Sequence, residues 1–457
     1  MCLDAKPLRP LTPVFDPNRS KPAQDRSGAQ DEAQSQAPHG TEPEADARAS
    51  STSGLAGETR DRKAWSVLLR PYDLLLARLL DRIAIGALSV VAPHGRCLDA
   101  RADLPGPQAK LVLHRWRALH RLIVGGDVAF AQAYIDGDWS SPDLPALTEL
   151  AALNFPVLAE RIAALPPLRL WNRLRHLLRR NSKRGSSRNI AFHYDLGNDF
   201  YRLWLDADMA YSSAIAIEPG QSLEAAQQAR IARIIHLLDA RPGARVLEIG
   251  CGWGGLAAAL ARHGARVTGI TLSPAQLAYV KERMRADPAC AAAIEVRLQD
   301  YRDVAERYDH VVSIEMLEAV GEAYWPVYFA KLRACLEPGG SAVVQVITIA
   351  EDRFEAYRRQ TDFIQHYIFP GGMLPTKTHI AHEAARAGLD LVATQCFGAG
   401  YAQTLAHWRA RFLKARPEIE AMGFDTRFQR LWDYYLSYCE GGFRSGAIDV
   451  GLYTLRG

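Results

Sequence analysis

A strand–turn–helix segment near the middle of the chain constrains the fold more than any other feature. It reads VLEIGCGWGG over residues 246–255, which is an apolar strand, a glycine-rich turn and the start of a helix. Glycine has no Cβ, so the backbone of such a turn bends tightly and lies directly against a ligand. Gly250, Gly252 and Gly255 also satisfy the dinucleotide pattern GxGxxG, which is weak evidence when it stands alone.

The position of the nearest acidic residue separates two classes of ligand. Dinucleotide enzymes hold the ribose with an acid at the end of the second strand, about 20 residues further on. Here that strand ends in GITLS, residues 269–273, without an acid. The acid stands at Glu248 inside the first strand, where it can face a methionine ammonium group, while Asp300 and Tyr301 after the third strand can bracket an adenine ring. The segment therefore predicts S-adenosylmethionine as the cofactor.

Strand-like and helix-like segments alternate from residue 186 to residue 457. Apolar runs at 245–249, 267–271, 294–298, 310–314 and 341–349 predict strands, and 222–238, 255–262 and 273–285 predict helices. Such alternation is typical of a parallel sheet covered on both faces. We therefore predict an α/β fold, a Rossmann-like class I methyltransferase sheet, for this catalytic domain.

The chain before residue 186 divides into two parts. Residues 1–60 are rich in Pro, Ala, Gln, Ser and acidic residues, a composition that predicts a disordered tail. Residues 61–185 predict a smaller, mostly helical domain, with glycines flanking a short helical core in GGDVAFAQAYIDGDW, residues 125–139. This domain ends in arginines interleaved with leucines over 168–188. That segment is either a solvated helix face at a domain boundary or an interfacial helix attracted to anionic lipid headgroups.

Composition limits the compartment and the partners. The seven cysteines are scattered without metal-ligand spacing, so we expect reduced thiols in the cytoplasm and no metal. The N-terminus lacks the apolar core of a secretory signal, and no run of about 18 uncharged apolar residues predicts a membrane span. The net charge is only +4 and no nucleic-acid motif is present, so we expect no nucleic-acid partner.

From about residue 193 the chain resembles the cyclopropane-fatty-acyl-phospholipid synthase family, which includes the mycolic acid cyclopropane synthases. The most specific matches are YIFPGG at 367–372 and YCEGGFR at 438–444. Weaker similarity extends upstream to AYIDGDW at 133–139. The other matching stretches are FHYDLGNDFY at 192–201, MAYSSAI at 209–215, GITLSPAQ at 269–276, LQDYRD at 298–303, EMLEAVG at 315–321 and FGAGYAQTL at 397–405.

The resemblance implies transfer of the S-adenosylmethionine methyl to the cis double bond of a phospholipid acyl chain. The resulting carbocation loses a proton to a bound bicarbonate, and a cyclopropane ring closes. The resemblance also implies a homodimer that works at the inner face of the membrane. Relatives make exomethylene or methyl-branched chains, in which the same cation loses a different proton. A small-molecule methyltransferase and a catalytically inactive membrane-binding protein stay open as alternatives.

The resemblance also assigns site residues by position. Glu318 and Tyr401 match bicarbonate-binding positions, with Ile347 contributing its backbone, and Cys439 matches a cysteine regarded as an active-site residue. Ser213 and Gln345 stand where many members have cysteine and histidine; both still donate hydrogen bonds to an anion, but neither titrates near neutral pH as histidine does. His193, Tyr194, Tyr367 and Phe369 are expected to contact the lipid. The cofactor-binding positions are Tyr211, Ser212, Glu248, Ile249, Gly250, Cys251, Gly252, Trp253, Gly254, Thr271, Leu272, Ser273, Gln276, Asp300 and Tyr301.

Overall fold

The computed structural model describes residues 71–162 and 196–457, which lie in one compact unit, Trp65–Gly457. Three predictions lie outside the described residues: the disordered tail, the basic segment at 168–188, and the lipid contacts of His193 and Tyr194. Among the described residues, no helix is long and apolar enough to cross a membrane.

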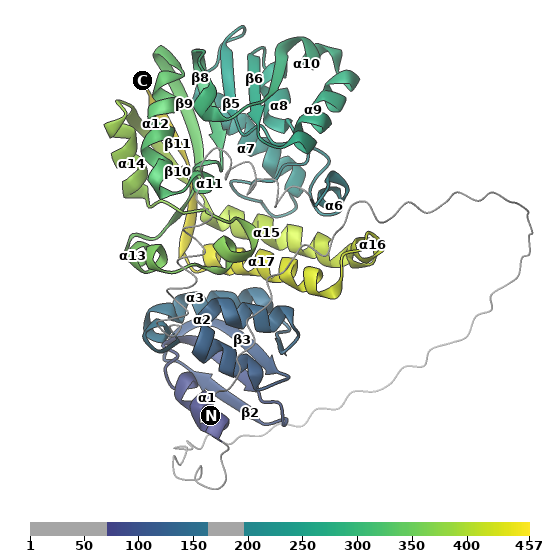
Figure 1. The fold of residues 1–457 in the computed structure, drawn as a ribbon, viewed down its shortest axis with the longest axis vertical. Coiled ribbons are helices and arrows are strands. Elements are labelled where there is room, and N and C mark those ends of the chain that lie inside the picture. The colour runs from purple at the N-terminus through teal and green to yellow at the C-terminus, as the bar shows by residue number, and fades with distance from the viewer. Residues whose placement is uncertain (1–70, 163–195) are drawn as a thin grey trace, which may run out of the picture. The chain divides into compact units, whose positions relative to one another are not determined.

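A seven-stranded sheet forms the centre of residues 196–457 (Figure 1). Its strand order is β10-β11-β9-β8-β5-β6-β7, and the five strands β9, β8, β5, β6 and β7 run parallel. Strand β11 runs antiparallel to both of its neighbours. The strands are β5 Arg245–Ile249, β6 Arg266–Thr271, β7 Ile294–Leu298, β8 Tyr308–Ile314, β9 Leu336–Ile349, β10 Asp390–Cys396 and β11 Ile448–Arg456.

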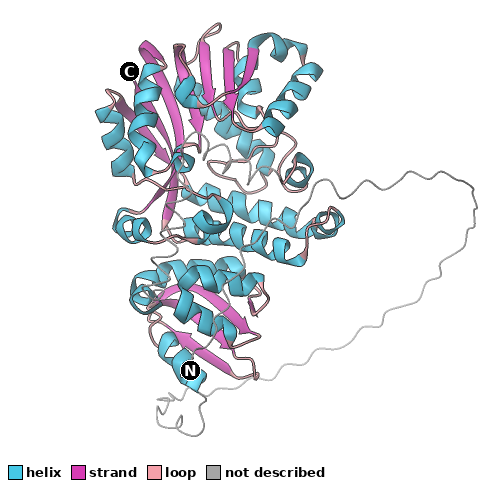
Figure 2. Cartoon of the chain, in the orientation of Figure 1, coloured by secondary structure: helices cyan, strands magenta, loops and turns pink. Residues whose placement is uncertain are grey.

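Helices cover both faces of this sheet (Figure 2). Successive residues of β5 show why, because Val246 belongs to one buried cluster and Leu247 to the other. The predicted α/β sheet is thereby confirmed, and α8 has the predicted bounds. The helices are α6 Asn198–Arg202, α7 Leu223–Leu238, α8 Gly255–Arg262, α9 Pro274–Ala286, α10 Pro288–Ala293, α11 Leu317–Val320, α12 Trp325–Ala334, α13 Glu351–Arg359, α14 Lys377–Arg386, α15 Gly398–Lys414, α16 Arg416–Ala421 and α17 Thr426–Arg444, with short helical turns η1 Tyr301–Asp303, η2 Glu322–Tyr324 and η3 Ile364–Ile368.

Residues 71–162 contain more helix than strand, as predicted, but they also contain a four-stranded sheet that the sequence pattern did not reveal. Its order is β2-β1-β3-β4. The third strand begins LPGPQ, in which four of the five residues are exposed, so it shows little apolar alternation. The elements are α1 Pro71–Leu80, β1 Ile85–Val91, β2 Cys97–Arg101, β3 Leu104–Leu113, α2 Arg117–Ile135, β4 Trp139–Ser140 and α3 Leu144–Ile162.

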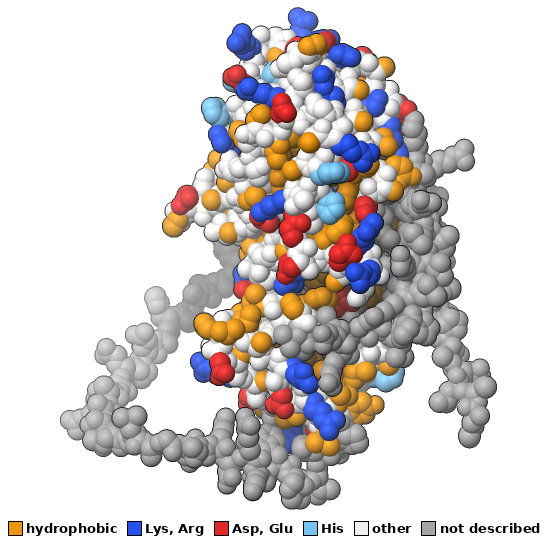
Figure 3. Space-filling model, turned by 90° about the vertical axis from the view of Figure 1, so that its left-hand side faces the viewer, with side chains coloured by type: hydrophobic (Ala, Val, Ile, Leu, Met, Phe, Trp, Pro, Cys, Tyr) orange, Lys and Arg blue, Asp and Glu red, His pale blue; other side chains and the backbone are white. Residues whose placement is uncertain are grey.

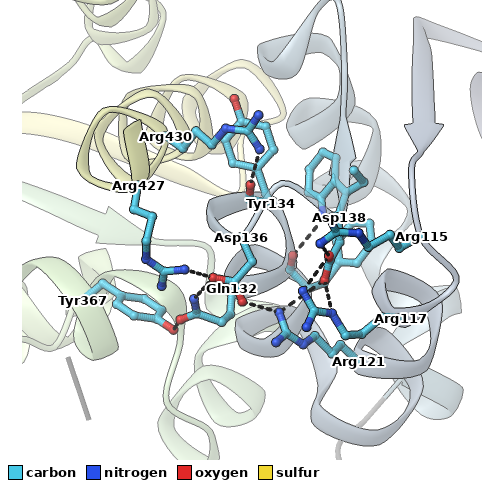
Figure 4. A network of polar contacts seen from close by, with 12 residues as sticks. Arg115, Arg117, Arg121, Gln132, Tyr134, Asp136, Asp138, Tyr367, Arg427 and Arg430 are labelled. Carbon is cyan, nitrogen blue, oxygen red and sulfur yellow. Dashed lines mark hydrogen bonds and ion pairs between the residues drawn. The ribbon is translucent and has the colours of Figure 1, made fainter. Parts of the chain in front are cut away.

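The motif AYIDGDW forms the turn between α2 and β4 and carries a polar network (Figure 4). Asp138 is fully buried and accepts two hydrogen bonds of 2.8 Å from Arg117. Asp136 pairs with Arg121 and with Arg427 of α17. Since α17 also packs against α3, this network fixes residues 71–162 onto the catalytic domain.

Candidate active site

One cavity of about 660 Å³ lies at the carboxyl ends of the parallel strands, where α/β sheets bind their ligands. Its wall combines the glycine turn, the ends of β8 and β9, and helices α15 and α17. Residues 71–162 contribute mostly apolar side chains, among them Leu88, Leu111, Leu119, Leu122 and Leu147. The cavity therefore joins a polar end at the sheet to a long apolar region.

The glycine turn has the conformation that its sequence requires. Gly250, Gly252 and Gly254 have φ values of 82°, 52° and 81°, which disfavour residues with a Cβ. A Cβ on Gly250 would lie 2.6 Å from Met316 Cγ. A Cβ on Gly252 would meet no heavy atom within 4 Å, so the space beside it is open to a ligand.

Glu248 places a buried carboxyl group beside this turn. Its side chain lines the cavity, is 3 % exposed and has an Oε2 atom without a hydrogen-bond partner among the described residues. Burial raises the pKa of this carboxyl group to about 8. A buried acceptor without a partner fits an ammonium group, so the structure suits the methionine end of S-adenosylmethionine.

The other predicted cofactor positions fall into two groups. Tyr211, Ser212, Cys251, Trp253 and Gln276 line the cavity together with Glu248, Gly250 and Gly252. The second group does not line the cavity in the described part of the chain; it consists of Ile249, Gly254, Thr271, Leu272, Ser273, Asp300 and Tyr301.

Several of the second group support the wall from behind. Thr271 donates a 2.8 Å hydrogen bond to Gln276 Oε1, and Ser273 caps α9 by accepting from Gln276 N. Asp300 is engaged by Arg302, at 2.6 Å from Oδ2 to Nη2. The assignments of these residues to direct cofactor contacts stay predictions.

Glu315 occupies the centre of the polar end. Its Oε1 accepts hydrogen bonds from Ser212 Oγ at 2.6 Å and from Gln345 Nε2 at 2.7 Å. Its Oε2 accepts one from the Tyr401 hydroxyl at 2.7 Å. Burial raises the pKa of the Glu315 carboxyl group, and these hydrogen bonds oppose that effect.

Arg230 of α7 brings a positive charge to the same cluster. Its Nη1 donates to Ser212 Oγ at 2.7 Å and to Gln345 Oε1 at 2.9 Å. The guanidinium is buried, and burial lowers its pKa while the charge of Glu315 raises it. A buried arginine and a buried carboxylate that share hydrogen-bond partners compensate each other's desolvation.

Glu318 lies three residues further along the chain, in the short helix α11. Its Oε1 accepts the backbone N–H of Ile347 at 2.5 Å, and its Oε2 has no partner among the described residues. Burial, followed by repulsion from Glu315, raises the pKa of Glu318 to about 8. Two carboxyl groups of the chain therefore engage Gln345, Tyr401 and the Ile347 amide, the donors that the resemblance assigns to bicarbonate. A bicarbonate ion does not fit these residues as they stand.

Four other predictions have mixed outcomes. Ser213 is fully buried outside the cavity wall, and it is the neighbouring Ser212 that reaches the anionic cluster. Cys439 lines the cavity, but burial raises its pKa and keeps the thiol neutral. Phe369 lines the cavity, and its predicted contact with the lipid stays a prediction. Tyr367 does not, because its hydroxyl turns to Gln132 in the network of Figure 4.

The sequence interpretation missed Glu315 and Arg230. Glu315 directly follows β8, and an acid at the carboxyl end of a parallel strand is a signal that could have identified it. Arg230 sits in an otherwise ordinary amphipathic helix, and nothing in its sequence context distinguishes it from a surface arginine.

Comparisons with known proteins identify the family of the chain. Residues 181–452 match the family model described as mycolic acid cyclopropane synthetase. The chain is 39% identical over 389 residues to the tuberculostearic acid methyltransferase UfaA1 of Mycobacterium tuberculosis, which covers 83% of this chain and 90% of the relative. It is 34% identical over 340 residues to the cyclopropane-fatty-acyl-phospholipid synthase of Escherichia coli K12, covering 73% and 84%.

Solved structures give the same result for the catalytic domain. The cyclopropane synthase MmaA2 of Mycobacterium tuberculosis superimposes with a TM-score of 0.55 at 31% identity, over 59% of this chain and 98% of that one. The mycolic acid cyclopropane synthase CmaA1, complexed with SAH and CTAB, gives 0.56 at 30% identity with the same coverage. The chain therefore belongs to the mycolic acid cyclopropane synthetase family of S-adenosylmethionine-dependent methyltransferases.

Proposed function

We propose that this protein transfers the methyl carbon of S-adenosylmethionine to the cis double bond of an unsaturated phospholipid acyl chain. The observation that carries the proposal is the cavity, in which a buried acidic cluster opens directly onto a wall of leucine, isoleucine and aromatic side chains. Such a wall suits a hydrocarbon chain, because burial of apolar surface is favourable and each methylene contributes about 0.8 kcal/mol.

The residues divide the work between the two substrates. S-adenosylmethionine supplies an electrophilic methyl group on a sulfonium. Glu248 would hold its ammonium group, and the open face of Gly252 gives it room. The apolar wall holds the alkene against the methyl and excludes water, since an alkene is a weak nucleophile that needs proximity. The charge of Glu315 and the ring faces of Tyr435 and Phe443 favour a carbocation at this end of the cavity.

Two products are compatible with this chemistry. A cyclopropane ring is the product that the sequence resemblance implies, and the name of the Escherichia coli relative agrees with it. The 39% identical relative bears the name of a methyltransferase, which favours an exomethylene or methyl-branched chain as the second candidate. A saturated methyl branch also needs a reductant, so within this second class the unassisted product would be the exomethylene chain.

We further propose that the protein works at the cytoplasmic membrane surface. Residues 71–162 expose large apolar side chains, among them Tyr72, Leu74 and Leu104, and Phe155 is exposed while it also lines the cavity. On the face shown in Figure 3, basic and acidic side chains alternate, so these apolar residues support membrane contact better than net charge does. The resemblance also implies a homodimer, and we propose that the protein is one.

The test is incubation of the full chain with S-adenosylmethionine and liposomes of unsaturated phospholipid. We expect acyl chains one carbon longer, detected by mass spectrometry of their methyl esters, and NMR distinguishes a ring from an exomethylene group. Glu318→Gln should abolish the product, whereas Glu337→Gln, which changes an accessible carboxylate paired with Arg245, should not. Methylation of a soluble acceptor without liposomes would support the small-molecule alternative. Cofactor binding without any turnover would support the alternative of a catalytically inactive membrane-binding protein.

A further inference from the structure

Three hydrogen-bond donors at the polar end of the cavity point at one carboxylate of the chain itself. Ser212 Oγ, Gln345 Nε2 and the Tyr401 hydroxyl converge on the two oxygens of Glu315 at 2.6–2.7 Å. Arg230 donates to both Ser212 and Gln345 and so orients them. These donors form an anion-binding site, and the carboxylate of Glu315 occupies it.

The backbone of Glu315 shows that the surroundings hold this side chain in place. Its φ is 52°, in the left-handed region that favours glycine, and only Met209 and Asp239 share a positive φ among the non-glycine residues that the structure describes. The Glu315 amide donates to Gln345 O at 2.8 Å, which fixes the peptide against β9. Residues kept in such conformations cluster at active sites, where the position of the side chain is functional and the surrounding structure offsets the cost of the strained backbone.

The Glu315 carboxylate also has capacity left for chemistry. A carboxylate has about four lone-pair positions, of which Oε1 uses two and Oε2 uses one. Glu315 lines the cavity, and one position on Oε2 accepts no hydrogen bond from the described residues. The Tyr401 hydroxyl stays a donor, because burial raises its pKa well above the ordinary value.

We propose that Glu315 is the base of the reaction and takes the place of a bound bicarbonate ion. This inference rests on the proposed function. The alkene π pair forms a bond to the methyl carbon, the carbon–sulfur bond breaks with its pair going to sulfur, and the other alkene carbon becomes cationic. Glu315 Oε2 then accepts a proton from the added methyl group, and the pair of that C–H bond closes the ring. Glu315 is left neutral and returns the proton to solvent after the product leaves.

The first test compares activity with and without bicarbonate in sealed, CO₂-depleted buffer. Wild-type activity should change less than twofold when bicarbonate is added. Glu315→Gln keeps the shape but cannot accept the proton, so turnover should fall at least 100-fold while S-adenosylmethionine binds unchanged. Glu355→Gln, on the exposed face of α13, should behave as wild type. A wild-type enzyme that needs bicarbonate, or an active Glu315→Gln, would overturn the proposal.

The second test does not depend on turnover. Glu315→Gly suits the backbone and leaves Ser212, Gln345 and Tyr401 without their acceptor. Carbon-13 NMR of labelled bicarbonate should then show line broadening with Glu315→Gly and none with the wild type. Broadening with the wild type would overturn the inference even if lipid methylation is confirmed. If the wild type methylates no lipid in any buffer, the proposed function fails, and the NMR result still decides whether Glu315 fills the anion site.

Discussion

At the scale of single residues, the polar end of the cavity consists of buried carboxyl groups with different partners. Glu315 accepts three hydrogen bonds, Glu318 accepts one from a backbone amide, and Glu248 keeps an oxygen without a partner. The pKa values of Glu318 and Glu248 are raised to about 8 by burial, so near pH 7 each is largely protonated until a cation arrives. We therefore propose separate roles, with Glu248 beside the cofactor and Glu315 and Glu318 beside the alkene.

Glu248→Gln tests the cofactor role. We expect roughly 10- to 100-fold weaker binding of S-adenosylmethionine, since a hydrogen bond to a charged group contributes about 1.5–3 kcal/mol. The ammonium favours the ionised carboxylate and lowers its pKa, so wild-type binding at pH 7 should release a proton to the buffer. Calorimetry in two buffers of different ionisation enthalpy measures both effects. Equal affinity and equal proton release in the variant would show that Glu248 does not contact the ammonium group.

At the scale of elements, the sequence allowed the five parallel strands to be predicted, because each is a short apolar run that ends at a turn. Strands β10 and β11 were not predicted. The sequences DLVATQC and IDVGLYTLR mix polar with apolar residues and contain no long apolar run, and only the pairing of these two segments in the folded sheet identifies them as strands. The site showed the same limit. Motif positions led to Glu318, whereas the role of Glu315 depends on a strained φ and on donors from β9, α15 and the loop before α7, which only the folded chain brings together.

Helices α2 and α17 are joined by a buried carboxylate, and loss of its charge should weaken the contact between them. Asp433 of α17 is buried and accepts hydrogen bonds from Tyr134 at 2.8 Å and from Arg409 at 2.7 Å. Asp433→Asn should destabilise the protein by about 2 kcal/mol, because it removes the charged hydrogen-bond partner of the partly buried Arg409 guanidinium. Urea unfolding measures this loss, with the exposed Asp390→Asn as the control. Lipid methylation should fall further than cofactor binding; an equal fall in both would contradict a role for α2 in holding the acyl chain.

At the scale of the whole molecule, residues 71–162 and the catalytic domain share one cavity. The glycine turn, Glu248 and Glu315 all belong to the catalytic domain, yet much of the apolar wall comes from the other part of the chain. This division predicts that residues 71–162 set acyl-chain preference without affecting the chemistry at the sheet.

Leu122→Trp puts that division to the test. Leu122 of α2 lines the cavity and is only partly buried, so the larger indole shortens the apolar region without filling a closed core. Displacement of two methylenes would cost about 1.6 kcal/mol, roughly tenfold in kcat/KM. We expect this loss for 18-carbon relative to 14-carbon unsaturated chains in mixed liposomes, with unchanged binding of S-adenosylmethionine. Ile123→Trp, one residue along the same helix and outside the cavity wall, controls for the added bulk. Equal losses on both chain lengths would mean that the acyl chain does not extend to α2.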